Sequence, residues 1–266
     1  MLFPPGLFTL EFMQNAWVAG TAVAIVGGVV GFFVVLRGAT FVAHAVPRAS
    51  FAGAAGAALV GQSSALGLGT FAVLSALGIA SISQERRHGV ATALILAAAL
   101  GLGDLFLTIG HVYAPAVFAL LFGQIVGIST PDVHAVLIVS AITVVLFAAT
   151  FRPLLLQTVS PHVAEARGFW TRGLEVWFLL LVSGAAAAMV PVVGALLAFS
   201  LMVGPAATGS IIGKSPLKAL GWSIVFGVLS LWLSVWLAYL TFWPIGFFVS
   251  GFCLLFYAAA RLITRS

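Results

Sequence analysis

Residues 16–36 read AWVAGTAVAIVGGVVGFFVVL, an apolar stretch without a single charged side chain. As a helix this stretch would extend about 31 Å, which matches the roughly 30 Å hydrocarbon core of a bilayer. Comparable stretches recur along the whole chain of 266 residues, of which 62% are hydrophobic and 6% charged. A soluble domain carries about 25% charged residues. The sequence therefore predicts an all-α, polytopic transmembrane bundle that forms a single domain over residues 1–266.

The apolar stretches predict about nine membrane crossings. They cover residues 16–36, 41–61, 64–83, 89–110, 132–151, 174–191, 192–212, 218–240 and 243–261. Residues 174–212 are expected to form two short helices broken at Pro191, or one helix and a re-entrant piece. If one of the assigned helices is re-entrant, eight spans remain. Residues 111–131 contain Pro115, Gly123 and Gly127 and are expected to form a helix lying at the outer surface.

The basic residues give an orientation for these crossings. If nine helices alternate, ten of the eleven basic residues fall on one side: Arg37, Arg86, Arg87, Arg152, Arg167, Arg172, Lys214, Lys218, Arg261 and Arg265. The excess of Lys and Arg on cytoplasmic loops makes this side cytoplasmic. The N-terminus is then outside and the C-terminus inside, with Glu11, His111, Asp132 and His134 on the outer side. Arg48 is the one basic residue that lies elsewhere.

Residues 37–61 read RGATFVAHAVPRASFAGAAGAALVG and carry ionisable groups inside an apolar stretch. Thr40, His44 and Arg48 are spaced four apart and would share one face of a helix. An ionisable side chain at membrane depth costs roughly 2.5–3.5 kcal/mol on insertion scales, so this face is a candidate functional site. A neutral imidazole is a common metal ligand, but a lone histidine also occurs bonded to a backbone carbonyl, and one histidine does not make a metal site.

Asp104 is the single acidic residue placed inside an apolar stretch, near the end of the predicted fourth span. It is either a ligand or the counter-ion of Arg48. Two glycine pairs, Gly27 with Gly31 and Gly209 with Gly213, have the spacing that lets helices approach closely.

The one long hydrophilic loop, residues 152–173, is predicted to be cytoplasmic. Within it, residues 160–168 read SPHVAEARG, with a serine and proline suited to a helix start and a glycine suited to its end. This short helix is either a plain surface turn or a docking element for a cytoplasmic partner.

Several other functions are excluded by pattern. Residues 209–215, GSIIGKS, have one residue too few between glycine and Gly-Lys-Ser for a phosphate-binding loop. No zinc-protease, Gly-x-Ser-x-Gly or paired-aspartate motif occurs, so the chain is not expected to be an enzyme, and it needs no cofactor of its own. The net charge of +5 comes from scattered residues and does not indicate nucleic-acid binding.

Four stretches, in order along the chain, resemble the membrane subunits of bacterial ABC importers for zinc and manganese. They are GFFVVLR (31–37) leading to His44-Ala45, LFGQ (121–124), the segment 160–168, and VGALL (193–197) followed by GPAAT (204–208). Each is moderately specific alone, whereas their order and spacing together are strong. The resemblance covers nearly the whole length.

The resemblance implies a permease of the bacterial cell (inner) membrane that works as two copies in contact with lipid. Two ATPase subunits, which hold the ATP, would dock at residues 160–168, where Ser160, Pro161, Ala164, Glu165 and Gly168 carry the match. An extracytoplasmic solute-binding protein would deliver the metal to the outer face. Thr40, His44, Arg48 and Asp104 are the candidate pathway residues, with His44 as a metal ligand.

Two departures from the family pattern leave the cargo open. The family has an aspartate four residues before its histidine, where this chain has Thr40, and Gln124 likewise replaces an acid. One hypothesis is that Arg48 is neutralised, by Asp104 for example, and that Zn²⁺ or Mn²⁺ passes along His44 and backbone oxygens. A second is that the cargo is chelated or anionic. A third, a membrane scaffold, would not co-purify with an ATPase.

Overall fold

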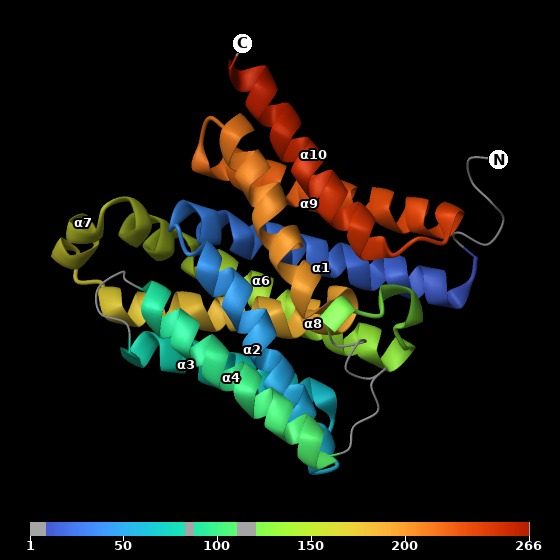
Figure 1. Cartoon of the computed structure of the whole chain (residues 1–266). Coiled ribbons are helices and arrows are strands. Elements are labelled where there is room, and N and C mark those ends of the chain that lie inside the picture. Colours follow the sequence, from blue (N-terminus) through green and yellow to red (C-terminus); the bar gives the residue numbers. More distant parts are fainter. Residues whose placement is uncertain (1–8, 83–87, 111–120, 266) are drawn as a thin grey trace.

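The computed structural model describes residues 9–82, 88–110 and 121–265, and within these ranges the chain is helical with no strand (Figure 1). Arg86, Arg87 and His111, which entered the orientation argument, lie outside the described residues. The helices are α1 (Glu11–Leu36), α2 (Thr40–Leu59), α3 (Ser64–Ile82), α4 (His88–Gly110), η1 (Ile125–Gly127), α6 (Thr130–Val159), α7 (Pro161–Ala166), α8 (Thr171–Ile212), α9 (Pro216–Thr241) and α10 (Ile245–Arg265).

Seven of these helices are long and apolar enough to cross a membrane: α1, α3, α4, α6, α8, α9 and α10. Their bounds follow most of the predicted stretches, because long apolar runs fix the position of a span. The loop predicted over 152–173 is shorter than expected, since α6 continues to Val159 and α8 begins at Thr171. α2 is not among the seven, since His44, Pro47 and Arg48 lower its hydropathy. It packs instead against α1, α3, α4 and α8, so protein rather than lipid surrounds most of it.

The centre of the bundle is formed by α1 and α8. In their most apolar windows, 72% of α1 and 61% of α8 is buried inside the protein, against 17% of α10. A Cβ atom added at Gly31 would overlap the backbone carbonyl of Met202, so α1 and α8 meet backbone to backbone there. Gly27 lies against the same helix, which confirms the close approach predicted for this glycine pair.

The predicted break at Pro191 is wrong, and the break lies at Gly194. Pro191 is inside α8, whereas the backbone of Gly194 has φ 82° and ψ 159°, a conformation essentially restricted to glycine. Two limbs result, residues 171–193 and 195–212, which are roughly 35 and 27 Å long at 1.5 Å per residue. Figure 1 shows the second limb turning away from the first. The nine predicted stretches thus correspond to α1–α4, α6, both limbs of α8, α9 and α10.

One end of the bundle is held together by polar contacts between the starts of α1 and α6. Thr130 Oγ1 donates to Glu11 Oε1 at 3.1 Å, and Asn15 Nδ2 donates to the Ile128 carbonyl at 3.3 Å. Glu11 and Asp132 therefore lie at the same end, as predicted, while the side of the membrane on which they lie stays a prediction. Of the helix expected over 111–131, residues 111–120 lie outside the described residues, and 125–127 form the short η1.

Candidate functional site

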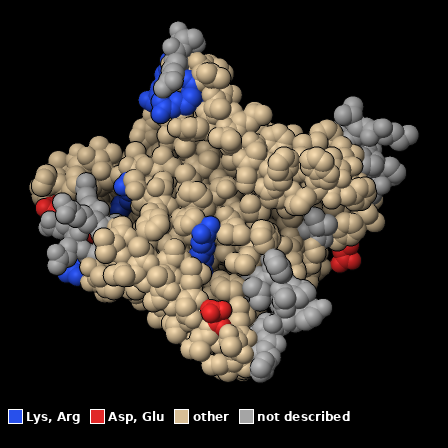
Figure 2. Space-filling view, viewed as in Figure 1, with Lys and Arg blue, Asp and Glu red and all other residues tan. Residues whose placement is uncertain are grey.

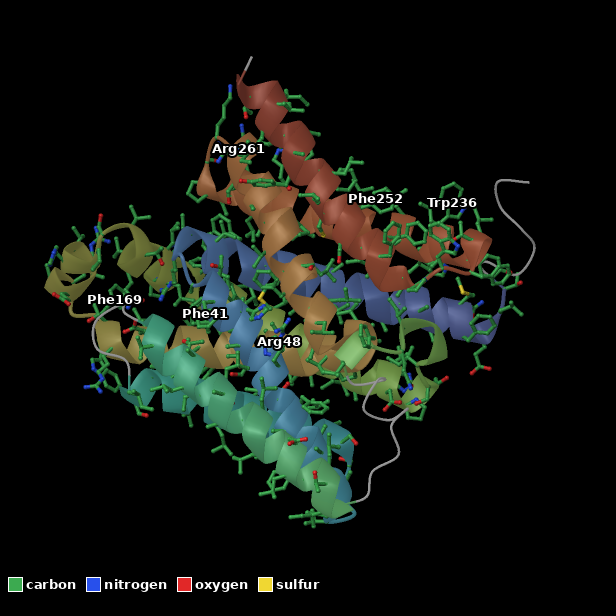
Figure 3. The ribbon with its side chains drawn as sticks, in the orientation of Figure 1. Phe41, Arg48, Phe169, Trp236, Phe252 and Arg261 are labelled. Carbon is green, nitrogen blue, oxygen red and sulfur yellow. The ribbon has the colours of Figure 1, made fainter. Side chains whose placement is uncertain are left out.

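The polar stripe of α2 lies on the open side of an otherwise buried helix. Thr40, His44 and Arg48 are each partly exposed, whereas the positions between them are buried except for Phe41, as Ala43 and Val46 show. The predicted common face is therefore present in the fold. Figure 3 places Phe41 and Arg48 on this side of α2, in the middle of the view.

His44 is held by aromatic rings rather than by hydrogen bonds. Its ring stacks on Phe41 with centroids 6.3 Å apart and meets Phe199 edge-on at 5.1 Å. No hydrogen bond joins His44 to any described residue, so it is not the carbonyl-bonded core histidine that the sequence left as an alternative. The packing fixes the plane of the imidazole, and no hydrogen bond to a described residue occupies either nitrogen, so the unprotonated one can bind a ligand.

Arg48 has no counter-ion within the part of the chain that the structure describes. Its Nε is buried without a hydrogen-bond partner. Asp104 is exposed on α4 and lies beyond ion-pair distance of Arg48, so the expected pairing does not form within one chain. Figure 2 shows a basic group in the middle of a mostly tan face, at the place where Figure 3 labels Arg48, with an acidic group below it on the same face.

The second limb of α8 forms the wall beside this stripe. Leu196, Phe199 and Val203 recur at helical spacing and are partly exposed, and the Phe199–His44 contact joins this wall to α2. The opposite side of the limb is covered by α10, where Gly204 faces Cys253. The open face of the chain therefore combines one polar stripe with one mostly apolar wall.

The break in α8 rests on a second glycine. Gly123 (φ 79°) and Gly194 (φ 82°) face one another, and a Cβ added at either would lie about 2.4 Å from backbone atoms of the other segment. Neither position has room for a side chain. Two of the stretches that carry the family resemblance, residues 121–124 and 193–197, thus meet at one point in space.

Known proteins match this chain over nearly its full length. The model of the ABC 3 transport family matches residues 9–262. The chain belongs to the ABC 3 transport family. The manganese transport system membrane protein MntC of Listeria monocytogenes is 27% identical over 242 residues, covering 90% of this chain and 86% of that protein. The manganese import system permease protein ScaB of Streptococcus parasanguinis is 26% identical over 239 residues, covering 89% and 85%.

A solved structure shows the same fold. PsaBC from Streptococcus pneumoniae in complex with Fab matches with a TM-score of 0.86 at 24% identity, covering 96% of this chain and 92% of that chain. As an ABC 3 permease with seven candidate spans among its described residues, the chain is a multi-pass protein of the bacterial inner membrane.

The segment that the resemblance assigns to ATPase coupling forms α7. Pro161 is its first residue and Gly168 (φ 78°) follows its end, where the Gly168 and Phe169 amides donate to Glu165 and Ala164 carbonyls at 2.8 and 3.1 Å. The Ser160 side chain does not cap the helix as expected. Of the six residues of α7, Ala164 alone is buried, so the helix presents most of its surface outward.

Within residues 9–82, 88–110 and 121–265, no three His, Cys, Asp or Glu side chains lie together in a group that could hold a metal ion.

Gly209 and Gly213 pack against Ala219 of α9, so the segment that resembles a phosphate-binding loop is a helix-packing element.

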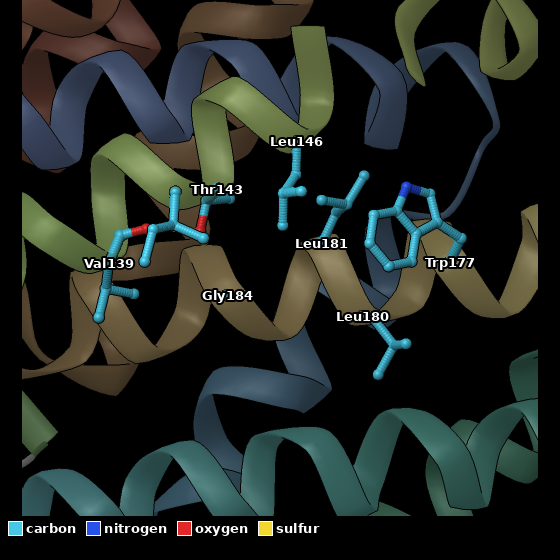
Figure 4. A pocket seen from close by; sticks show the side chains of 8 residues that line it. Val139, Thr143, Leu146, Trp177, Leu180, Leu181 and Gly184 are labelled. Atoms are coloured by element: carbon cyan, nitrogen blue, oxygen red, sulfur yellow. The ribbon is translucent and has the colours of Figure 1, made fainter. Parts of the chain in front are cut away.

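An apolar groove lies between α6 and the first limb of α8 (Figure 4). Its two polar side chains are already used: Thr143 Oγ1 donates to the Val139 carbonyl at 2.8 Å, and Trp177 Nε1 donates to Thr150 Oγ1 at 3.1 Å. The remaining lining residues are Ile142, Leu146, Leu180, Leu181 and Gly184. This groove offers nothing to a cation.

Two functional features were missed by sequence reasoning. Phe199 fixes His44, and the only available signal was its place on the apolar stretch after Gly194. Arg37 was interpreted as an orientation signal, although its side chain donates hydrogen bonds to α6 and stacks on Phe178 of α8. Both roles depend on contacts between segments more than 100 residues apart.

Proposed function

We propose that this chain is the permease subunit of an ATP-driven ABC importer for a divalent transition metal, manganese or zinc. The relatives MntC and ScaB are named as manganese transport proteins, and the proposal extends that cargo class to this chain. Manganese is the first candidate on this ground, with zinc as the second, because imidazole and backbone oxygens suit either ion.

The single observation that carries the proposal is the free imidazole on the open stripe. His44 is partly exposed and is oriented by Phe41 and Phe199. Its imidazole forms no hydrogen bond with any described residue. Two copies facing one another across this stripe would supply two imidazoles. Two ligands bind a divalent ion more weakly than the three or four of a resident site, which suits a pathway that must release its cargo.

The proposed permease would bind a different partner at each end of the bundle. A cytoplasmic ATPase subunit would bind the exposed face of α7 and supply the ATP chemistry, and a solute-binding protein would deliver metal at the opposite end, near Glu11 and Asp132. The N-terminus is then outside and the C-terminus cytoplasmic.

Arg48 supports a second candidate cargo. Residues four apart on a helix are about 6 Å apart, and two unit charges at this separation repel by roughly 3 kcal/mol at an effective dielectric near 20. With no counter-ion among the described residues, Arg48 opposes a bare cation next to His44 and would favour a chelated or anionic species.

Uptake by the complex in proteoliposomes separates these functions. The permease, its ATPase and its binding protein would be reconstituted and supplied with ATP and with Mn²⁺ or Zn²⁺. ATP-dependent uptake that falls at least tenfold in His44→Ala supports the bare-ion pathway. Uptake that is unchanged in His44→Ala and lost in Arg48→Ala supports the chelated or anionic cargo. A chain that fails to co-purify with the ATPase would be a scaffold.

A further inference from the structure

Arg37 joins three helices at the predicted cytoplasmic end of the bundle. It caps the end of α1, and its Nη2 donates to the Leu154 carbonyl at 3.3 Å and to Gln157 Oε1 at 2.7 Å. Its guanidinium carbon also lies 4.5 Å from the centre of the Phe178 ring. One side chain therefore connects α1 to the last turns of α6 and to the first turns of α8.

Gln157 links the two ends of the segment that contains α7. While its oxygen accepts from Arg37, its Nε2 donates to the Thr171 carbonyl at 2.6 Å, and the side chain is buried. The link spans from the end of α6 to the start of α8, and α7 lies between the two. α7 itself packs against α6 and α8. A force applied to α7 therefore reaches the bundle through the two helix ends that Gln157 and Arg37 hold.

Arg37 is also close in sequence to the polar stripe, because a short turn joins the end of α1 to the start of α2. Gly38 (φ 66°) and Ala39 form a closed turn, in which their amides donate to the Val35 and Val34 carbonyls at 3.1 and 2.9 Å. α2 begins at Thr40, only three residues after Arg37. A hydrogen-bonded turn of this length transmits a displacement of the α1 end to the start of α2.

We infer that Arg37, with Gln157, is the positioning residue that couples the α7 docking helix to the pathway stripe of α2. This inference rests on the proposed function. The contacts explain why an arginine is needed: its planar group bonds two acceptors on α6 and stacks on Phe178 at the same time, which the point charge of lysine does not reproduce. A mere orientation signal would work equally well with either residue.

Arg37→Lys tests the inference because it keeps the charge and removes the geometry. The readout is the amount of metal transported per ATP hydrolysed by the reconstituted complex with its ATPase and binding protein. We expect the ATPase to co-purify and hydrolyse ATP as with the unaltered chain, while the transport ratio falls about tenfold, within the usual range of coupling effects. Arg172→Lys, an exposed basic residue on the same predicted side, is the matched control and should keep the ratio.

Gln157→Glu provides a second, independent variant. It keeps the acceptor for Arg37 and removes the amide that donates to Thr171, so the ratio should again fall. If Arg37→Lys yields too little folded protein, the transport ratio of Gln157→Glu alone tests the inference. An unchanged ratio per assembled complex, even with less complex formed, would mean that these residues only stabilise the fold and would overturn the inference. Failure of the unaltered chain to bind the ATPase would overturn the proposed function instead.

Discussion

Arg37 and Arg48 lie eleven residues apart on the same connected segment, yet the protein treats them in opposite ways. The Arg37 guanidinium bonds to two groups on α6 and stacks on Phe178. Arg48 lies on the open face of α2 and makes no hydrogen bond to any described residue. The Nε atoms of both arginines are buried without a hydrogen bond, so the difference lies in the rest of the guanidinium. A buried polar group without a hydrogen bond costs about 1–3 kcal/mol.

The two arginines therefore differ in role. Arg37 holds helices of the bundle together, whereas Arg48 is placed to interact with cargo, water or a second copy of the chain. Arg37 stabilises the bundle and positions other helices, so its loss should weaken the fold. Arg48 contributes little to the fold in one copy, and its cost is understandable if cargo, water or a second copy meets it on the open face. The same residue type thus has two roles, which substitutions can distinguish.

The largest effect is expected at Gly194, whose break sets the α8 wall beside the stripe. Gly194→Ala would place a Cβ about 2.4 Å from the Leu121 carbonyl oxygen, in addition to backbone strain. We expect a loss of about 3–5 kcal/mol of unfolding free energy. Thermal unfolding can be followed with a thiol-reactive dye that reaches the single, buried Cys253 only after unfolding.

The control for this prediction is Gly221→Ala on α9, where an added Cβ meets no atom within 4 Å. It should be neutral or slightly stabilising, because alanine favours the helix. Equal effects of the two substitutions would contradict the role assigned to the break.

Removal of Arg37 is expected to have the next largest effect on stability. Arg37→Ala leaves Gln157 Oε1 and the Leu154 carbonyl without this donor and removes the contact with Phe178, so unfolding should become easier by about 2–4 kcal/mol. The same dye assay measures it. A loss below about 0.5 kcal/mol, typical of a surface substitution, would break the contrast with Arg48.

Arg48→Ala should not lower the free energy of unfolding, since no interaction with a described residue is lost and the buried, unpaired Nε is removed. Its effect should appear in transport: relief of the repulsion estimated from Coulomb's law should raise Mn²⁺ uptake at low concentration by several-fold. Initial rates at a range of Mn²⁺ concentrations measure this change. A rate that falls instead would favour the chelated or anionic cargo.

Phe199→Leu should have the smallest effect. It removes the edge-on ring contact with His44, worth about 0.5–1.5 kcal/mol, and keeps an apolar wall. Uptake should fall a few-fold at most, with assembly intact, because the imidazole remains but is less well oriented. Uptake rates of purified, reconstituted complexes are sensitive enough to detect it.

Much of this architecture was predictable because apolar runs fix membrane spans. The predicted stretch 64–83 became α3 at Ser64–Ile82, and the face shared by Thr40, His44 and Arg48 followed from helical spacing alone. The short helix at Pro161 also followed from local rules for helix starts and ends.

Contacts between distant segments were not predictable in this way. The break was assigned to Pro191 because proline disrupts helices, whereas Gly194 takes that role through its contact with Gly123 seventy-one positions earlier. Asp104 was matched to Arg48 by charge, but their positions on α4 and α2 keep them apart. The charge of Arg37 was sufficient to interpret it as a signal for membrane orientation. Its hydrogen bonds to α6 depend on the tertiary fold and could not be predicted from its position in the sequence.

The central claim is that the open stripe of α2 carries the cargo, and His44 tests it most directly. ATP-dependent Mn²⁺ uptake would be measured for the reconstituted complex with the unaltered chain and with His44→Ala, at equal amounts of bound ATPase. Uptake at least tenfold lower in His44→Ala, with assembly and ATP hydrolysis retained, is the predicted result. Equal uptake by the two complexes would place the pathway elsewhere.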